Sequence, residues 1–126
     1  MTTSFTFSKQ EKLCSKIIIE KVFEGKKVLH LFPFSIYYQH CMLPINIPVQ
    51  VSFGVSKKTF KNAVDRNKIK RYMREAYRLN KQQVLPLEEG QQIALIVIYH
   101  AKKILSFQAI EKKWKEAIEE FIKSIE

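Results

Sequence analysis

The stretch "QQIALIVIY", residues 91–99, is apolar without a break from Ile93 to Ile98. A strand with one wet face alternates polar and apolar residues, whereas a strand buried on both faces is apolar throughout. The run therefore predicts a strand in the middle of a sheet, and Pro86 and Gly90 mark the loop before it. A central strand needs neighbours, and the preceding chain supplies candidates.

Two earlier segments alternate between apolar and polar residues, as strands with one buried face do. The apolar face of residues 32–40 consists of Phe34, Ile36 and Tyr38. The apolar face of residues 47–55 consists of Ile47, Val49, Val51, Phe53 and Val55. Because only the short connection 41–46 separates them, we expect these two strands to pair with each other, antiparallel. Residues 26–30 are expected to add a short edge strand.

Residues 8–24 have the spacing of an amphipathic helix. The N-cap, its capping-box partner and the stop are expected to be Ser8, Glu11 and Gly25. The wide apolar arc of this helix comprises Leu13, Ile17, Ile18 and Val22. Ile19 and Phe23 lie four residues apart outside that arc, so this apolar pair needs a partner of its own.

A second amphipathic helix is expected from Ser106 to the end of the chain. Its apolar residues recur at spacings of three and four: Phe107, Ile110, Trp114, Ala117, Ile118, Phe121, Ile122 and Ile125. Lys and Glu residues fill the positions between them. Such a helix covers a sheet with its apolar side.

A third helix is expected after Asn62, which can cap it, with Asp65 at the third helical position. Its apolar stripe comprises Ile69, Tyr72, Met73, Ala76 and Leu79. Its opposite side carries Arg66, Asn67, Lys70, Arg71, Arg74, Arg78 and Lys81. Repulsion costs a few tenths of a kcal/mol per pair of like charges, whereas burying a large apolar side chain contributes about 1.5–3 kcal/mol. The stripe can therefore hold the charged side in place.

The expected order is helix, two or three strands, helix, strand, helix, which indicates a small α/β fold of the α+β sandwich type. The 126 residues have the length of one domain, so residues 1–126 are interpreted as a single domain. A hydrophobic content of 46% is typical of a globular chain rather than a disordered one.

The net charge of +10 is concentrated in one region. Residues 57–81 contain ten Lys and Arg but only two acidic residues, so +8 of the excess lies there. This concentration favours an anionic partner such as nucleic acid or a membrane surface. A basic face without a function is the alternative, although a solvated face usually mixes Lys with Glu.

No run of about eighteen apolar residues could span a membrane, and no charged start leads into an apolar signal segment. A cytoplasmic location and no membrane partner are therefore expected. Cys14 and Cys41 form no CxxC pair and are interpreted as reduced thiols.

The chain lacks the residues of a metal-dependent nuclease, which needs clustered carboxylates. Asp65 is the one aspartate, and the expected helices interleave their Glu residues with Lys. The three histidines, His30, His40 and His100, lack metal-ligand spacing. We therefore expect no catalytic residue and no metal site in the polypeptide.

Two binding functions fit a basic helix. One is a structural RNA-binding protein, ribosomal or chaperone-like. The other is a DNA-binding protein that places the helix in the major groove, but such a recognition helix closely follows another helix, whereas here a strand precedes it.

The segment "VSKKTFKNAVDRNKIKRYMREAYR", residues 55–78, resembles the signature of the bacterial ribonuclease P protein subunit. The family's Arg-Asn-Arg motif, with the basic residues that follow it, matches Arg66, Asn67, Lys68, Lys70, Arg71 and Arg74. Lys57 and Lys58 match the paired lysines upstream. The resemblance implies the family's fold with its left-handed βαβ crossover.

The resemblance also implies that the protein assists a catalytic RNA in removing the 5′ leader from precursor tRNA. Contacts to the catalytic RNA are implied for Lys57, Lys58, Asn62, Arg66, Asn67, Lys68, Lys70, Arg71, Arg74 and Arg78. Contacts to the single-stranded leader, in a cleft between the first helix and the sheet, are implied for Ile19, Phe23 and Tyr37. Catalysis and Mg²⁺ binding would belong mainly to the RNA, and no obligate protein partner is implied.

The chain departs from the family pattern at three positions. Lys68 replaces the second Arg of the motif, so a forked contact becomes a point charge. Lys61 stands where the family often has Gly, at the turn before the helix. Ile19 replaces an aromatic residue and can pack against a base without stacking as a ring does.

Overall fold

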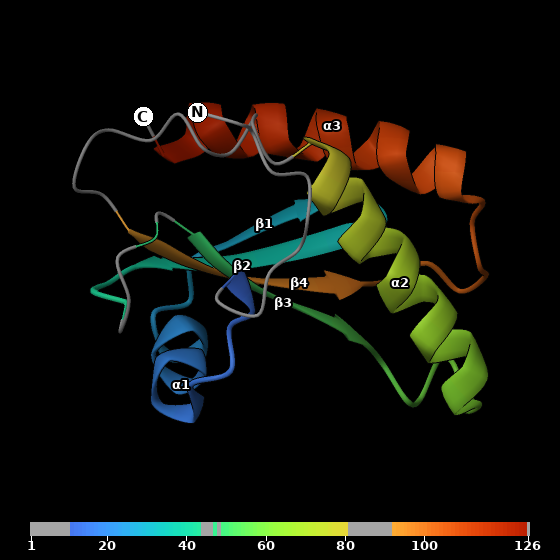
Figure 1. Cartoon of the computed structure of the whole chain (residues 1–126), viewed down its shortest axis with the longest axis horizontal. Coiled ribbons are helices and arrows are strands. Elements are labelled where there is room, and N and C mark those ends of the chain that lie inside the picture. Colours follow the sequence, from blue (N-terminus) through green and yellow to red (C-terminus); the bar gives the residue numbers. More distant parts are fainter. Residues whose placement is uncertain (1–10, 44–46, 48, 81–91, 126) are drawn as a thin grey trace.

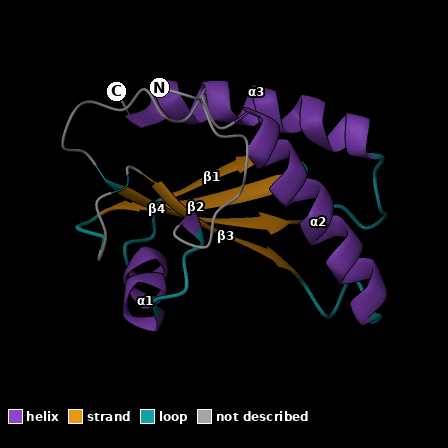
Figure 2. Ribbon diagram, viewed as in Figure 1, coloured by secondary structure: helices purple, strands orange, loops and turns teal. Residues whose placement is uncertain are grey.

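The computed structural model describes residues 11–43, 47, 49–80 and 92–125. Its elements are α1 (Lys16–Glu24), β1 (Val28–Leu31), β2 (Phe34–His40), β3 (Val49–Val55), α2 (Ala63–Asn80), β4 (Ile93–Tyr99) and α3 (Phe107–Ile125). A sheet separates α1 on one face from α2 and α3 on the other (Figures 1 and 2). The expected α/β order of elements is confirmed.

The four strands lie in the order β1-β2-β4-β3. The prediction that residues 32–40 and 47–55 pair with each other is wrong, because β4 lies between them. β4 pairs antiparallel with β2 and parallel with β3. β4 has the longest apolar run, so burying both of its faces removes few polar side chains from water. This explains why β4 lies between β2 and β3. The edge strand expected near residues 26–30 is confirmed as β1, paired with β2.

β4 contributes to two hydrophobic clusters, one on each face of the sheet. Ile93, Leu95, Val97 and Tyr99 belong to the cluster under α2 and α3. Ala94 and Ile96 belong to the smaller cluster under α1. The predicted apolar face of β2 is confirmed in the larger cluster. Ile47 departs from prediction, because it precedes β3 and packs in the α1-side cluster.

The first helix begins later than the sequence predicts, at Lys16, and Glu11 lies outside it. Ser15 is the N-cap, with its Oγ accepting a hydrogen bond from Ile18 N at 3.3 Å. The chain before it is extended along β3, where Leu13 N donates to Val51 O at 3.0 Å. Backbone groups used by the sheet edge cannot also serve a helix, so the helix has to start beyond them. Ser8 lies outside the described residues.

The late start also changes which residues of this segment are buried. Ile18 and Val22 are the buried residues of α1, and Leu13 packs beside them from the extended segment. Ile17, expected on the buried arc, is 68% exposed. The predicted stop at Gly25 is confirmed, since Gly25 N donates to Lys21 O at 3.0 Å.

α2 directly follows Asn62, as expected, and its buried residues are Ile69, Met73, Ala76 and Tyr77. Leu79, expected in the stripe, is 40% exposed. Tyr77 is buried instead, because its ring reaches Phe53 of β3, with 6.0 Å between centroids. The last helix is confirmed as α3, with Trp114 buried against the rings of Phe34, Phe53 and Tyr77. No described helix is long and apolar enough to cross a membrane.

Candidate nucleic-acid interface

The charged side of α2 is held by the apolar side beneath it. Arg66, Lys70 and Arg74 are four residues apart and form one row along the helix. These three side chains are half-buried, whereas Asn67 and Arg71 on the outer side are exposed. Lys81 lies outside the described residues. The structure thus gathers most of the predicted cations on one helix surface.

Lys68 points away from that row. Its Nζ lies 5.9 Å from the centroid of the Tyr72 ring, one turn further along the helix. The Tyr72 ring in turn contacts Phe107 of α3, with 5.9 Å between centroids. Lys68 therefore lies on the side of α2 that borders α3, where a cation over a ring is weakly attracted.

Arg78 is paired with an acid of its own helix. Its guanidinium contacts the carboxylate of Glu75, with Arg78 Nε donating to Oε2 at 3.2 Å and Nη2 contacting Oε1. The hydrogen bond from Arg78 lowers the pKa of the Glu75 carboxyl, and the carboxylate raises the pKa of Arg78. Both groups stay ionised at neutral pH, so Glu75 offsets part of the positive charge at this end of the surface.

The loop between β3 and α2 carries the two upstream lysines. Lys57, Lys58 and Asn62 are exposed, whereas Phe60 is buried with its ring 6.1 Å from that of Tyr99. The loop has no left-handed residue, since Lys26 is the one non-glycine with positive φ among the described residues. Lys61 can therefore stand where the family often has Gly.

A second group of predicted residues lies across the sheet, beside α1. Phe23 is 44% exposed, and its ring centroid lies 5.1 Å from that of Tyr37 on β2. Ile19 is half-buried and packs on the α1-side cluster. Phe23 therefore has a partner of its own in Tyr37, whereas Ile19 packs on the same cluster as the buried side of α1.

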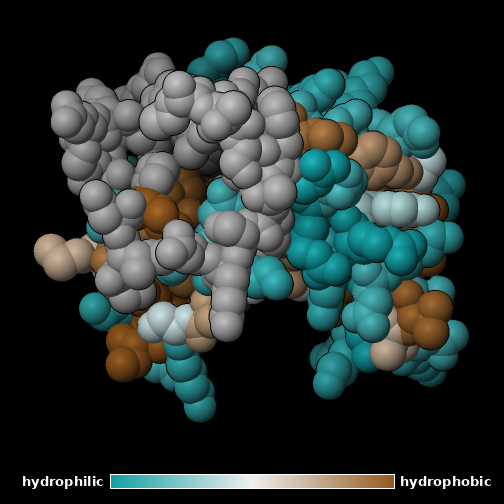
Figure 3. Space-filling view, in the orientation of Figure 1, coloured by the Kyte–Doolittle hydropathy of each residue, from teal (hydrophilic) through white to brown (hydrophobic). Residues whose placement is uncertain are grey.

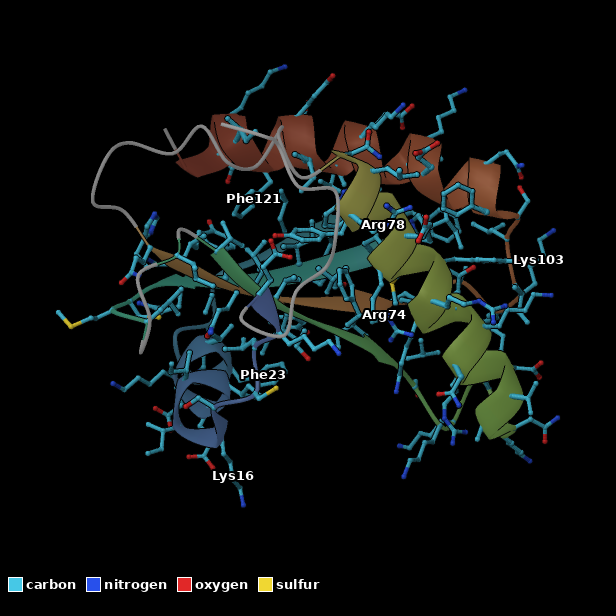
Figure 4. All side chains as sticks on the ribbon, viewed as in Figure 1. Lys16, Phe23, Arg74, Arg78, Lys103 and Phe121 are labelled. Carbon is cyan, nitrogen blue, oxygen red and sulfur yellow. The ribbon has the colours of Figure 1, made fainter. Side chains whose placement is uncertain are left out.

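The two groups lie on facing sides of an indentation. Figure 4 shows Phe23 on the side of α1 that faces α2, and Arg74 on the side of α2 that faces α1. Figure 3 shows the surface drawn inward between these two helices. An exposed aromatic surface and a cationic surface thus border a common hollow.

The histidines, acidic residues and cysteines of the described chain show no catalytic or metal-binding arrangement. His30 Nδ1 lies 2.8 Å from Ser35 Oγ, a contact between adjacent strands. Among residues 11–43, 47, 49–80 and 92–125, no group of three His, Cys, Asp or Glu side chains could hold a metal ion. Burial raises the pKa of the Cys41 thiol, which opposes formation of a nucleophilic thiolate.

A sequence model described as Ribonuclease P matches residues 7–122. The chain belongs to the ribonuclease P protein family. It is therefore a protein subunit of ribonuclease P, the endoribonuclease of tRNA maturation, and is involved in 5′ processing of precursor tRNA. Membership also implies association with the ribonuclease P RNA.

Two curated ribonuclease P protein components show the extent of the similarity. The one from Chlorobium phaeobacteroides is 35% identical over 117 residues, covering 83% of this chain and 80% of that protein. The one from Porphyromonas gingivalis is 30% identical over 122 residues, covering 94% and 89%. The similarity is not confined to the basic segment but extends along nearly the whole chain.

Solved structures of ribonuclease P proteins share the fold. The Staphylococcus aureus protein matches with a TM-score of 0.68 at 23% identity, covering 86% of this chain and 93% of that one. The Thermotoga maritima protein matches with a TM-score of 0.68 at 21% identity, covering 86% and 94%. The fold expected from the resemblance is confirmed, including the parallel unit β3-α2-β4.

The family decides between the binding functions left open by the sequence. A ribonuclease P protein acts in tRNA maturation, so neither a DNA-binding protein nor an RNA-binding protein outside cleavage describes this chain. Sequence reasoning missed the pairing of Arg78 with Glu75, although their spacing of three residues on a helix is a known signal for such pairs. It also missed the contacts of Arg66 with the preceding loop, which no spacing rule indicates.

Proposed function

We propose that the cationic surface of α2 and the loop before it bind the catalytic RNA of ribonuclease P. The contacting residues are Lys57, Lys58, Asn62, Arg66, Asn67, Lys68, Lys70, Arg71, Arg74 and Arg78. Arginine forks suit phosphate oxygens, and release of condensed counterions supplies affinity that depends little on sequence. Within this set, Lys68 and Arg78 contribute least, because one lies toward α3 and the other is offset by Glu75.

The single-stranded leader of precursor tRNA binds beside α1, against Phe23, Tyr37 and Ile19. A base can stack on an exposed ring, which contributes about 1–3 kcal/mol per base. Phe23 and Tyr37 already contact each other, so little side-chain freedom is lost when a base arrives. Ile19 offers an apolar edge to the neighbouring base.

The observation that carries this proposal is that Phe23, whose ring contacts that of Tyr37, lies on the side of α1 that faces the cationic helix (Figure 4). A strand of RNA in the hollow between α1 and α2 could meet rings on one side and cations on the other. This combination of a stacking surface and a positive groove is typical of single-strand binding.

The chemical step belongs to the RNA subunit in this proposal. The described chain offers no carboxylate cluster that fits Mg²⁺, so the ion is bound mainly by RNA. The protein neutralises phosphate repulsion and stabilises the active RNA conformation, with residues 1–126 acting as one domain. Cleavage assays across Mg²⁺ concentration should show activity for the complex at lower Mg²⁺ than for the RNA alone. Robust cleavage by the protein without RNA would contradict the assignment.

A binding comparison tests the leader site. The assembled complex should bind precursor tRNA more tightly than mature tRNA, and Phe23→Ala or Tyr37→Ala should reduce that preference by roughly 5- to 150-fold, the equivalent of one stacked base. Phe32→Ala is the matched control, because Phe32 is an equally aromatic, 68% exposed residue that lies in the turn between β1 and β2 and is not part of the Phe23–Tyr37 contact. An unchanged preference in both α1-side variants would reject the leader site.

A further inference from the structure

Arg66 makes contacts that a simple RNA-binding side chain would not need. Its Nη1 donates to Phe60 O at 2.7 Å and to Lys61 O at 2.8 Å. Its backbone N–H donates to Asn62 O at 3.2 Å. The bond to Asn62 is the helical backbone bond that any residue at this position makes, whereas the side chain of Arg66 holds the carbonyl groups of two successive loop residues.

The same loop is closed at its other end by Ser56. Ser56 O accepts a hydrogen bond from Phe60 N at 3.1 Å, and Ser56 Oγ accepts one from Lys58 N at 3.2 Å. Between these two fixed ends, the side chains of Lys57 and Lys58 are exposed. The position of both ammonium groups relative to α2 therefore depends on the hydrogen bonds of Arg66 to Phe60 O and Lys61 O.

The guanidinium retains donors after making these bonds. An arginine carries five N–H groups, and the two contacts to the loop use Nη1 alone. Within the described part of the chain, no hydrogen bond is found for Nε and Nη2 of Arg66, and the side chain is half-buried rather than covered. A lysine has no such fork and cannot hold two carbonyls while presenting a flat edge to a phosphate.

We propose that Arg66 is a positioning residue, whose guanidinium holds the lysine-bearing loop against the first turn of α2 and so sets Lys57 and Lys58 in register with the cations of that helix for RNA binding. This rests on the proposed function, in which the loop and α2 contact the same RNA. Arg66 then contributes to RNA binding in two ways, by its own charge and by fixing the positions of Lys57 and Lys58.

The first test needs no RNA. Amide hydrogen exchange of the folded protein should be faster at Lys58 and Phe60 in Arg66→Ala and in Arg66→Lys than in the native protein. Arg71→Ala is the matched control, because Arg71 is exposed on the same helix and should leave both amides unchanged. Circular dichroism establishes whether each variant is folded. If Arg66→Ala does not fold, the test is made with Arg66→Lys alone. Unchanged exchange at both amides in the Arg66 variants would overturn the proposal.

The second test measures coupling in RNA binding. Lys58→Ala is made in the native protein, in Arg66→Lys and in Arg71→Lys, and the affinity for ribonuclease P RNA is measured at one salt concentration. Both backgrounds keep the charge, so the electrostatic term is matched. The loss caused by Lys58→Ala should be at least about 2-fold smaller in Arg66→Lys than in the other two, because coupled residues are not additive.

The outcomes separate the two proposals. Equal losses in all three backgrounds would overturn the positioning role. If neither Lys57→Ala nor Lys58→Ala weakens RNA binding in the native protein, the loop's part in the proposed function fails, whereas the exchange experiment still judges whether Arg66 holds the loop.

Discussion

The rings of Phe23 and Tyr37 lie 5.1 Å apart between centroids, at an interplanar angle of 60°, although one belongs to α1 and the other to β2. Their contact explains how an exposed aromatic residue is kept in a defined orientation on a helix only nine residues long. A fixed ring costs less ordering entropy on binding than a mobile one.

Leader bases, rather than leader phosphates, should account for the effect of Phe23. Precursor tRNA with abasic leader nucleotides should bind the native complex about as weakly as ordinary precursor binds the Phe23→Ala complex. The reason is that stacking needs the base, whereas the phosphates remain in both substrates. Equilibrium binding with the four combinations of protein and substrate measures this. If Phe23→Ala weakens abasic and ordinary precursor by the same factor, Phe23 acts on something other than a base.

Arg74→Ala should weaken binding to ribonuclease P RNA and reduce the slope of log affinity against log salt by about one. Arg74 belongs to the half-buried row of α2, and removing one phosphate contact removes one counterion-release term. Its free energy of unfolding should change by no more than about 0.5 kcal/mol, as is usual for substitutions that disturb no buried contact. Salt titrations and urea denaturation are the measurements. A large loss of stability with an unchanged salt slope would show that Arg74 packs rather than binds.

Glu75→Gln should strengthen RNA binding, most clearly at low salt, because it frees the Arg78 guanidinium from its carboxylate partner. The same substitution in an Arg78→Gln background should have a much smaller effect. Affinities of the four proteins at two salt concentrations test both statements, and an equal gain in the two backgrounds would mean that Glu75 acts on the RNA by its general charge.

The same pair predicts a small pH dependence of stability. The pKa of Glu75 is lowered in the folded protein, so its contribution is present above the ordinary carboxyl value of 4.5 and is lost as the pH falls through the lower folded value. The effect should be small, because both side chains are partly exposed to screening solvent. Urea denaturation of the native protein and Glu75→Gln should therefore differ more at pH 6 than at pH 3. A difference that grows toward low pH would contradict the pairing.

Ser15→Ala should destabilise the protein by about 1 kcal/mol, because it removes the side-chain acceptor at the start of α1. Ser15→Asp should restore most of the loss, since Asp is also a good N-cap. Urea denaturation gives both values. A loss in Ser15→Ala that Ser15→Asp does not recover would mean that the hydroxyl has another role than capping.

Elements with long, consistent residue patterns could be predicted from the amino-acid sequence alone. The apolar run of β4 predicted its central place, and the period of α3 predicted its whole length. The charge of residues 57–81 predicted an anionic partner without any coordinates. The two apolar patterns are local and depend only on burial along one strand or helix, and the charge is a count over one segment.

The other features depend on contacts between segments that are far apart in the chain. The insertion of β4 between β2 and β3 and the late start of α1 follow from pairing between distant segments. The contact of Phe23 with Tyr37 requires α1 to pack against β2. The hydrogen bonds of Arg66 to Phe60 O and Lys61 O require the loop before α2 to be folded. Hydrogen bonds and ring contacts depend on positions in space to within about an ångström, which the spacing of residues along a chain does not specify.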